Sequence, residues 1–216
     1  MVNYIYLHGF ASSNNSTKAQ YIGNHFQNCQ IPLTIPDLND GNFSQLTLTR
    51  QLQQAAALFP DAVTPVRIIG SSLGGLAAAW LGQQYSQVES LVLLAPALGF
   101  LDLWLSYLGE AQVKQWQETD SLLVYHYGER RMLPIHYQFV EDLKQYSLNQ
   151  LNRPIPTLIL QGRYDEVIPI AFSRRYASER PWVKLIELES DHSLTNVLPQ
   201  IWQAIQHFFN LSPSTP

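Results

Sequence analysis

The chain has 216 residues, of which 46% are apolar and 14% are charged, and its formal net charge is −4. This composition is typical of a compact globular protein, and it excludes a disordered or coiled-coil chain. Without a basic surplus or a long Lys/Arg run, neither nucleic acid nor an anionic membrane surface is expected as a partner. We therefore expect a single domain over residues 1–216, since this length supports one sizeable core.

The sequence carries no signal for a membrane or an oxidising compartment. Its single cysteine, Cys29, cannot form an internal disulfide. The first residues lack a basic leader with a small-residue cleavage site, and no run of about 18 apolar residues occurs. We expect a cytoplasmic protein without a membrane span, and the sequence leaves its oligomeric state open.

Short apolar runs alternate with amphipathic segments along the chain. Runs that end at turn-forming residues predict six strands, at 4–7, 31–35, 66–69, 91–94, 157–160 and 183–188. Helical periodicity predicts a helix that begins at residue 17 and further helices over 44–59, 72–85 and 199–209. This alternation predicts an α/β domain, with a doubly wound, mostly parallel sheet and helices on both faces.

One stretch, residues 97–151, is too long for a simple crossover between two strands. It contains two or three helical stretches and a further region, residues 125–133, around Gly128. Ligands of parallel sheets bind at the carboxyl ends of the strands, so an insertion that leaves the fourth strand there would lie over that crevice. We interpret residues 97–151 as a small helical cap insertion within the domain.

A candidate nucleophile lies between a predicted strand and a predicted helix. The run Gly70-Ser71-Ser72-Leu73-Gly74 matches the G-x-S-x-G nucleophile elbow. The turn is sharp, so a side chain at position 70 or 74 would collide with the neighbouring strand or helix. Ser71 does not fit this frame, because Ile69 and Leu73 then occupy the positions that must be small. We predict Ser72 as the nucleophile.

A serine hydroxyl needs a base, and in hydrolases with this elbow the acid and then the histidine follow the serine along the chain. His192 comes just after the sixth predicted strand, whereas His207 falls inside the last predicted helix. Asp165 follows the fifth strand and is placed to orient the imidazole. Its neighbour Glu166 and the more distant Asp102 remain competing acids.

Acyl transfer also needs donors for the oxyanion that develops on the substrate. The N–H of Leu73 at the start of a helix is one candidate, because helix N-termini favour negative charge. The second is the N–H of Phe10, or of Ala11, in the loop after the first strand. We expect His8 to brace this loop through backbone contacts.

Several of these motifs together resemble the YqiA-like esterases of the α/β-hydrolase superfamily. The resemblance covers most of the chain and rests on the runs Leu7–Ser13, Lys18-Ala19, Gly70–Gly75, Ala95–Ala97, Gln161–Pro169 and Asp191-His192. It implies an α/β-hydrolase fold with the sheet order 2-1-3-4-5-6, and hydrolysis of carboxylic esters without a cofactor. The stretches 125–133 and 134–146 are somewhat similar to the lid of depalmitoylating thioesterases, which makes an acyl thioester the alternative substrate.

The remaining expectations concern the substrate and the rival functions. The chain has no H-E-x-x-H motif and no Cys/His cluster, so no metal site is expected. A small-molecule acyl ester or thioester is the expected partner, with Trp104, Tyr107 and Tyr127 as candidate contacts. Apolar residues at the start of the insertion either line an acyl site or, on the better interpretation, pack the cap on the sheet. A ligand-binding protein without turnover is the alternative of a different class.

Overall fold

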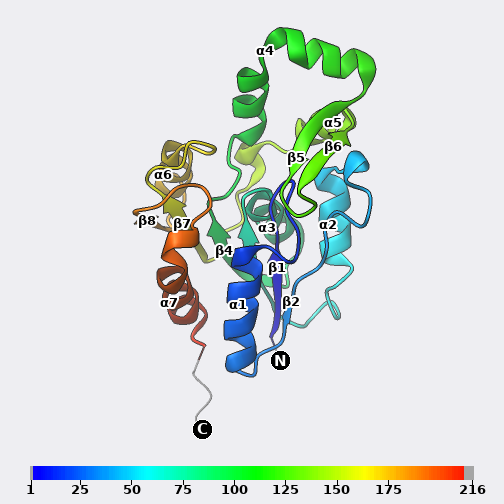
Figure 1. The fold of residues 1–216 in the computed structure, drawn as a ribbon. Coiled ribbons are helices and arrows are strands. Elements are labelled where there is room, and N and C mark those ends of the chain that lie inside the picture. The colour runs from blue at the N-terminus through cyan, green and yellow to red at the C-terminus, as the bar shows by residue number, and fades with distance from the viewer. Residues whose placement is uncertain (1, 212–216) are drawn as a thin grey trace.

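A six-stranded sheet runs through the centre of the computed structural model, which describes residues 2–211 (Figure 1). Its strands are β1 (Asn3–Leu7), β2 (Leu33–Thr34), β3 (Val66–Ser71), β4 (Val88–Leu94), β7 (Thr157–Gly162) and β8 (Val183–Leu188). The strand order is β2-β1-β3-β4-β7-β8, and every neighbouring pair is parallel. The predicted sheet order is therefore confirmed. Residues 1 and 212–216 of the predicted domain lie outside the described residues.

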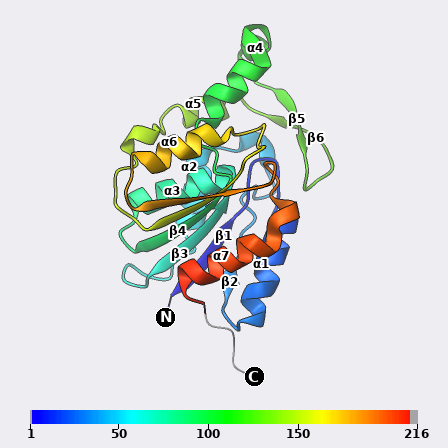
Figure 2. The ribbon, with the colours of Figure 1, turned by 90° about the vertical axis from the view of Figure 1, so that its left-hand side faces the viewer.

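Helices cover both faces of this sheet (Figure 2). One face carries α1 (Thr17–Asn28) and α7 (Leu198–Phe209), and the other carries α2 (Leu48–Ala56), α3 (Leu73–Gln84) and α6 (Ile170–Ser178). Short 3-10 turns, η1 (Phe43–Gln45), η2 (Leu148–Gln150) and η3 (Thr195–Val197), complete this part of the fold. The arrangement is the doubly wound one predicted from the alternation of strands and helices.

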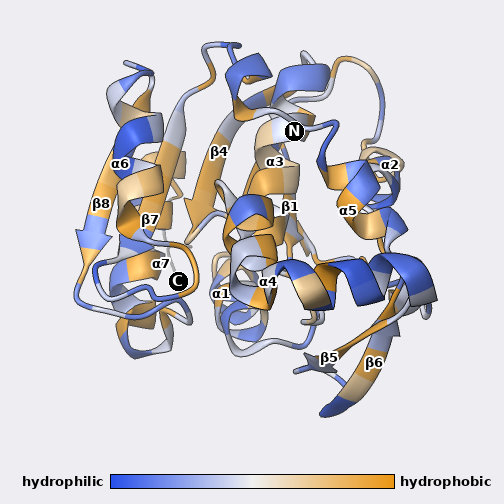
Figure 3. Cartoon of the chain, turned by 90° about the horizontal axis from the view of Figure 1, so that it is seen from above, coloured by the Kyte–Doolittle hydropathy of each residue, from blue (hydrophilic) through white to orange (hydrophobic). Residues whose placement is uncertain are grey.

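Burial on both faces explains why the central strands are continuous apolar runs. In β4, Leu91 and Leu93 enter the core under α3, while Val92 and Leu94 enter the core under α1 and α7. Seen from above, apolar residues gather on the central strands and on α3, and polar residues colour the outer part of α4 (Figure 3). The carboxyl ends of the strands are thus anchored in a core on each side.

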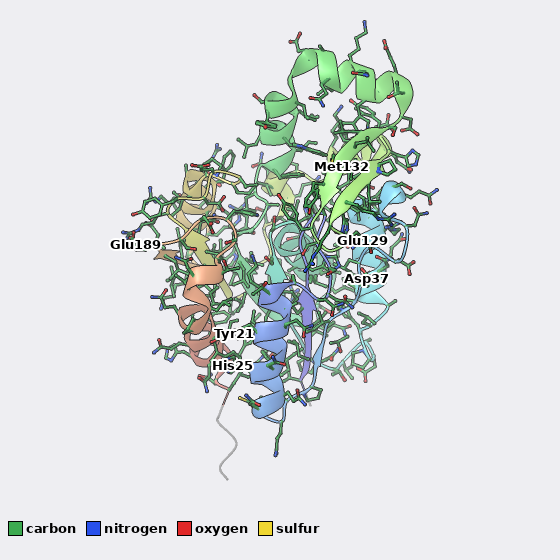
Figure 4. The ribbon with its side chains drawn as sticks, in the orientation of Figure 1. Tyr21, His25, Asp37, Glu129, Met132 and Glu189 are labelled. Carbon is green, nitrogen blue, oxygen red and sulfur yellow. The ribbon has the colours of Figure 1, made fainter. Side chains whose placement is uncertain are left out.

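The first helix is fixed to the last one. Ser16 caps α1 by accepting a hydrogen bond from the Ala19 N–H at 3.4 Å. The His25 ring stacks on Trp202 of α7 with 4.7 Å between ring centroids, and the Tyr21 ring centroid lies 4.6 Å from that of His25. Tyr21 and His25 are both labelled along α1 in Figure 4. These contacts make α1 a rigid element beside the sheet.

The predicted helix over 44–59 differs from the structure at its beginning. Leu46 and Thr47 have extended ψ angles of 132° and 155°, so the chain forms η1, leaves the helical conformation and restarts at α2. The reason is a cap, since the Thr47 hydroxyl accepts a hydrogen bond from the Arg50 N–H at 3.0 Å. The apolar period continues across this break, which is why the sequence pattern did not reveal it.

The insertion after β4 rises above the carboxyl edge of the sheet (Figure 1). It consists of α4 (Phe100–Thr119), an antiparallel hairpin of β5 (Leu122–His126) and β6 (Arg131–Ile135), and α5 (Gln138–Leu143). Gly109 has a φ of 75° and bends α4 into two arms. The cap is therefore helical in α4 and α5, as predicted, but its middle is a two-stranded sheet.

Candidate active site

Ser72 occupies the turn between β3 and α3. Its φ of 53° and ψ of −117° lie outside the regions that L-residues favour. Two backbone hydrogen bonds hold it there: the Ser72 N–H donates to the Leu94 carbonyl at 2.9 Å, and the Ser72 carbonyl accepts from the Ala97 N–H at 3.0 Å. Strained backbone of this kind persists only where the surroundings fix it, and here the end of β4 does so.

Glycines around this turn permit close approach of the backbone. A Cβ atom at Gly74 would lie 2.5 Å from the carbonyl oxygen of His8, and one at Gly70 would lie 2.7 Å from Cα of Gly75. Both distances are shorter than Cβ contacts in proteins allow. A Cβ at Gly9 would lie 3.1 Å from Cβ of Ser72, so the loop after β1 runs directly beside the candidate nucleophile.

His192 reaches this serine from the loop after β8. Its Nε2 lies 3.1 Å from Oγ of Ser72, and its Nδ1 lies 2.8 Å from Oδ2 of Asp165. With the proton on Nδ1, the imidazole donates to Asp165 and accepts from the Ser72 hydroxyl. His207, the rejected candidate, is exposed on α7. The structure thus brings the three predicted residues into one chain of hydrogen bonds.

The side chain of Asp165 is fully buried and accepts four hydrogen bonds. Oδ1 accepts from the N–H groups of Val167 at 2.9 Å and Ile168 at 2.7 Å. Oδ2 accepts from Nε2 of Gln161 at 2.6 Å and from Nδ1 of His192. An ionised carboxylate is an acceptor only, so this set of donors suits it and fixes its orientation.

The two competing acids lie elsewhere. Glu166 is exposed beside Asp165, and Asp102 is exposed in the first turn of α4. Asp191, next to the histidine, accepts from the N–H of Ser193 at 2.9 Å and from its hydroxyl at 2.6 Å, and these bonds lower the pKa of the Asp191 carboxyl. Asp191 therefore orders the loop on which the histidine lies.

Gln161 is a further residue of the candidate site, and the sequence motifs do not predict its role. It is fully buried at the end of β7. Its Nε2 donates to Asp165 and also to the Ile168 carbonyl at 3.2 Å, while its Oε1 accepts from the Ser173 hydroxyl of α6 at 2.9 Å. The available signal was a polar residue at the carboxyl end of an otherwise apolar strand.

The loop of the candidate oxyanion donors is held from two sides. The carbonyl of Ala11, which has a φ of 51°, accepts from the N–H of Tyr127 in the cap hairpin at 2.7 Å. Nδ2 of Asn39 donates to the Ser12 carbonyl at 2.7 Å. The Phe10 ring stacks on Phe139 of α5 with 5.3 Å between centroids. Cap and loop therefore form one packed unit beside Ser72.

His8 braces the same loop in the way the sequence predicts. It is fully buried, its Nδ1 donates to the Gly9 carbonyl at 3.0 Å and its Nε2 accepts from the Leu38 N–H at 2.9 Å. Burial lowers the pKa of His8, which keeps the ring neutral. Since the backbone occupies both ring nitrogens, the ring supports the loop rather than transferring protons.

A second buried histidine lies in the cap hairpin. His126 Nδ1 accepts from the Glu129 N–H at 3.0 Å, and burial lowers the pKa of the His126 ring. Two carboxylates, Glu129 in the turn of the hairpin and Asp37 in the loop after β2, oppose this shift by favouring the charged imidazole. Figure 4 labels both on the same side of the molecule. This histidine shapes the turn of the hairpin, whose Tyr127 N–H contacts the loop after β1 that carries Phe10 and Ala11.

The three candidate substrate contacts occupy different environments. Trp104 packs between the cap and the loop after β1, with its ring centroid 5.3 Å from those of Phe10 and Phe100. Tyr107 is 88% exposed on α4, and Tyr127 is 72% exposed in the hairpin. Trp104 thus packs the cap on the loop after β1, which is the packing role expected for the apolar residues at the start of the insertion. Tyr127 contacts the same loop through its main-chain N–H.

Other parts of the described chain carry no comparable constellation. A groove of about 780 Å³ lies between α7 and the strands β7 and β8, and none of its lining residues belongs to the site. Among residues 2–211, no group of three or more His, Cys, Asp or Glu side chains is placed to hold a metal ion. Within the same residues, no helix has the length and apolar character needed to cross a membrane.

The sheet order and the serine turn together identify the class of protein. A parallel sheet of this order, with a strained serine between a central strand and the following helix, defines the α/β-hydrolase fold. Within that class, the chain belongs to the family described as Uncharacterised protein family (UPF0227), which matches residues 3–210. The family suggested by the sequence motifs is thereby confirmed.

Solved structures of other proteins share this fold. Alpha/beta hydrolase domain-containing protein 10 from mouse is 20% identical, with a TM-score of 0.80 over 96% of this chain and 89% of its own. A monoacylglycerol lipase from Paleococcus ferrophilus is 16% identical, with a TM-score of 0.76 over 98% and 94%. Est1E from Butyrivibrio proteoclasticus, solved with ferulic acid, is 18% identical, with a TM-score of 0.73 over 97% and 88%.

Proposed function

We propose that the protein is a serine hydrolase that cleaves carboxylic esters through Ser72, His192 and Asp165. The observation that carries this proposal is the unbroken hydrogen-bond chain from the Ser72 hydroxyl through the imidazole to the buried carboxylate. Two proteins with the same fold, the monoacylglycerol lipase from Paleococcus ferrophilus and Est1E with ferulic acid bound, support ester substrates.

The reaction proceeds by acyl transfer in two steps. Oγ of Ser72 attacks the ester carbonyl carbon while Nε2 of His192 takes the hydroxyl proton, and the imidazolium then gives that proton to the departing alcohol. Water attacks the acyl-enzyme with His192 again as base, which releases the carboxylic acid and restores Ser72. Asp165 stays ionised and stabilises the imidazolium in both steps.

The negative charge on the substrate oxygen is stabilised by backbone donors. The Leu73 N–H begins α3 and lies at the positive end of the helix dipole. The Phe10 N–H is the second donor in this proposal, on a loop that the cap hairpin and Asn39 hold in place. A rigid loop keeps the donor oriented before the charge appears, which is the source of its catalytic effect.

A fluorophosphonate probe tests this function directly. We expect the wild-type protein to be labelled, and Ser72→Ala to lose labelling together with a roughly millionfold loss of kcat. Ser71→Ala is the matched control, because Ser71 is the neighbouring serine, buried at the end of β3, and this variant should retain both labelling and kcat. A panel of p-nitrophenyl esters and acyl thioesters of increasing chain length then distinguishes an esterase from a thioesterase.

Two results would refute the proposal. Hydrolysis of p-nitrophenyl acetate by Ser72→Ala at the wild-type rate would exclude Ser72 as the nucleophile. A folded wild-type protein that is never labelled would indicate instead a hydrolase fold that binds its ligand without turnover.

A further inference from the structure

We propose that Lys18 is a positioning residue of this site, which fixes the loop carrying His192 relative to the helix that follows the oxyanion loop. This inference rests on the proposed function, since it assigns Lys18 an effect only if His192 acts as the base. The distinguishing feature is a contact between two segments that lie 175 residues apart in the chain.

The contact is a hydrogen bond to the main chain beside the imidazole. Nζ of Lys18 donates to the carbonyl of Ser193 at 2.7 Å. Ser193 follows His192 directly, so this bond fixes the peptide unit between Ser193 and Leu194, one residue beyond the base. On the other side of the loop, the Tyr164 N–H donates to the Ser190 carbonyl at 3.0 Å. His192 is therefore held between two anchors, and Lys18 is the one on α1.

This anchor is effective because α1 is rigid. Lys18 lies in the first turn of the helix, just after the Ser16 cap. Ala19, Ile22 and Phe26 bury the inner face of α1 against the sheet. A hydrogen bond from a fixed helix restricts the loop it contacts, whereas one from a mobile side chain on a flexible segment would not. The oxyanion loop leads directly into the same helix.

The charge on Lys18 also matters here. Asp165 and Asp191 are the two carboxylates that act on the amine, and they favour its protonated form. Burial opposes them and prevails, so the pKa of Lys18 is lowered to about 8. An ammonium donates a shorter and stronger hydrogen bond to a carbonyl than a neutral amine does. The anchor on Ser193 is thus strongest while Lys18 is charged.

This pKa fixes the direction of the pH dependence. Below the lowered pKa of Lys18 the ammonium is intact, and as the pH rises through about 8 the charge is lost. The value of kcat should therefore decline on the alkaline side through this range. Arginine stays protonated throughout it, so Lys18→Arg should remove the decline.

The test compares variants at the same position with a matched lysine elsewhere. We expect Lys18→Met to lower kcat about tenfold with KM within about twofold, because a displaced base slows the chemistry without touching the substrate. Lys18→Arg should restore most of kcat near neutral pH and keep it at alkaline pH. Lys114→Met is the control, since Lys114 is 77% exposed on α4. Rates are measured per site titrated with the fluorophosphonate.

Two outcomes of this test decide against the inference. It is overturned if Lys18→Met keeps its kcat per titrated site and loses only thermal stability, since that indicates a structural role alone. It is equally overturned if the wild-type kcat does not decline through the pH range in which Lys18 loses its charge. Should Lys18→Met fail to fold, the pH profiles of the wild type and of Lys18→Arg still decide. A wild type that is never labelled would refute the proposed function as well.

Discussion

Replacing Asp165 with asparagine tests the hydrogen-bond count around the buried carboxylate. The amide oxygen will take the place of Oδ1, because two backbone N–H groups, of Val167 and Ile168, point at that position. The amide NH₂ then takes the place of Oδ2, where it faces two further donors, Gln161 Nε2 at 2.6 Å and His192 Nδ1 at 2.8 Å. Donors then face donors in a fully buried position.

Two magnitudes follow from this conflict. The imidazole can relieve its own clash by moving its proton to Nε2, but it then has no lone pair for the Ser72 hydroxyl, a change that costs about 10⁴-fold in kcat. The Gln161 amide keeps a buried donor without an acceptor, which costs about 1–3 kcal/mol of folding free energy. In a protein of this size, that loss lowers Tm by roughly 2–12 °C.

The assay combines kcat on a short p-nitrophenyl ester, the rate of fluorophosphonate labelling and thermal unfolding. Asp102→Asn is the matched control, because it makes the same chemical change on the exposed first turn of α4. A near-normal kcat in Asp165→Asn with a large loss in Asp102→Asn would refute the assignment of the acid. A loss of activity without any loss of stability would refute the count of donors around the carboxylate.

Two further changes probe the elbow and the buried histidine. Gly74→Ala places a Cβ 2.5 Å from the His8 carbonyl oxygen and should lower the free energy of unfolding by about 3 kcal/mol or more. Gly23→Ala is the control and should have little effect, because its Cβ meets only the end of the Ile35 side chain at 3.1 Å. Because burial lowers the pKa of His8, the unfolded chain takes up a proton that the folded chain does not, so stability is retained above about pH 6.5 and lost as the pH falls below it. A Tm that does not fall between neutral and mildly acidic pH would contradict this expectation.

The sheet and the three central residues of the site were accessible from the sequence because local patterns encode them. The continuous apolar run of β4 predicts a strand buried on both faces. Gly70 and Gly74 encode the serine turn, since no other residue fits there. Asp165 and His192 each follow directly after a predicted strand, and parallel strands bring their carboxyl ends to one edge.

The cap hairpin and the supporting residues were not accessible in this way. In β5, the residues that alternate inward are Leu122, Val124 and His126. This alternation covers too few residues to be distinguished from a helical segment by sequence. The contacts of Lys18 join residues far apart in the chain, so no local pattern reports them. For Gln161, only the structure reveals the hydrogen bond that its side chain, near the end of β7, donates to Asp165.

The hydrogen bond between the cap hairpin and the loop after β1 should respond differently to two kinds of sequence change in the cap. Its donor is the Tyr127 N–H and its acceptor is the Ala11 carbonyl, so both partners are main-chain atoms. Substitutions of exposed side chains in the hairpin can alter the surface offered to a substrate while this bond persists. An insertion or deletion in the turn would move the N–H itself. Changes of length in the cap should therefore affect catalytic rate, whereas changes of residue type should affect substrate preference.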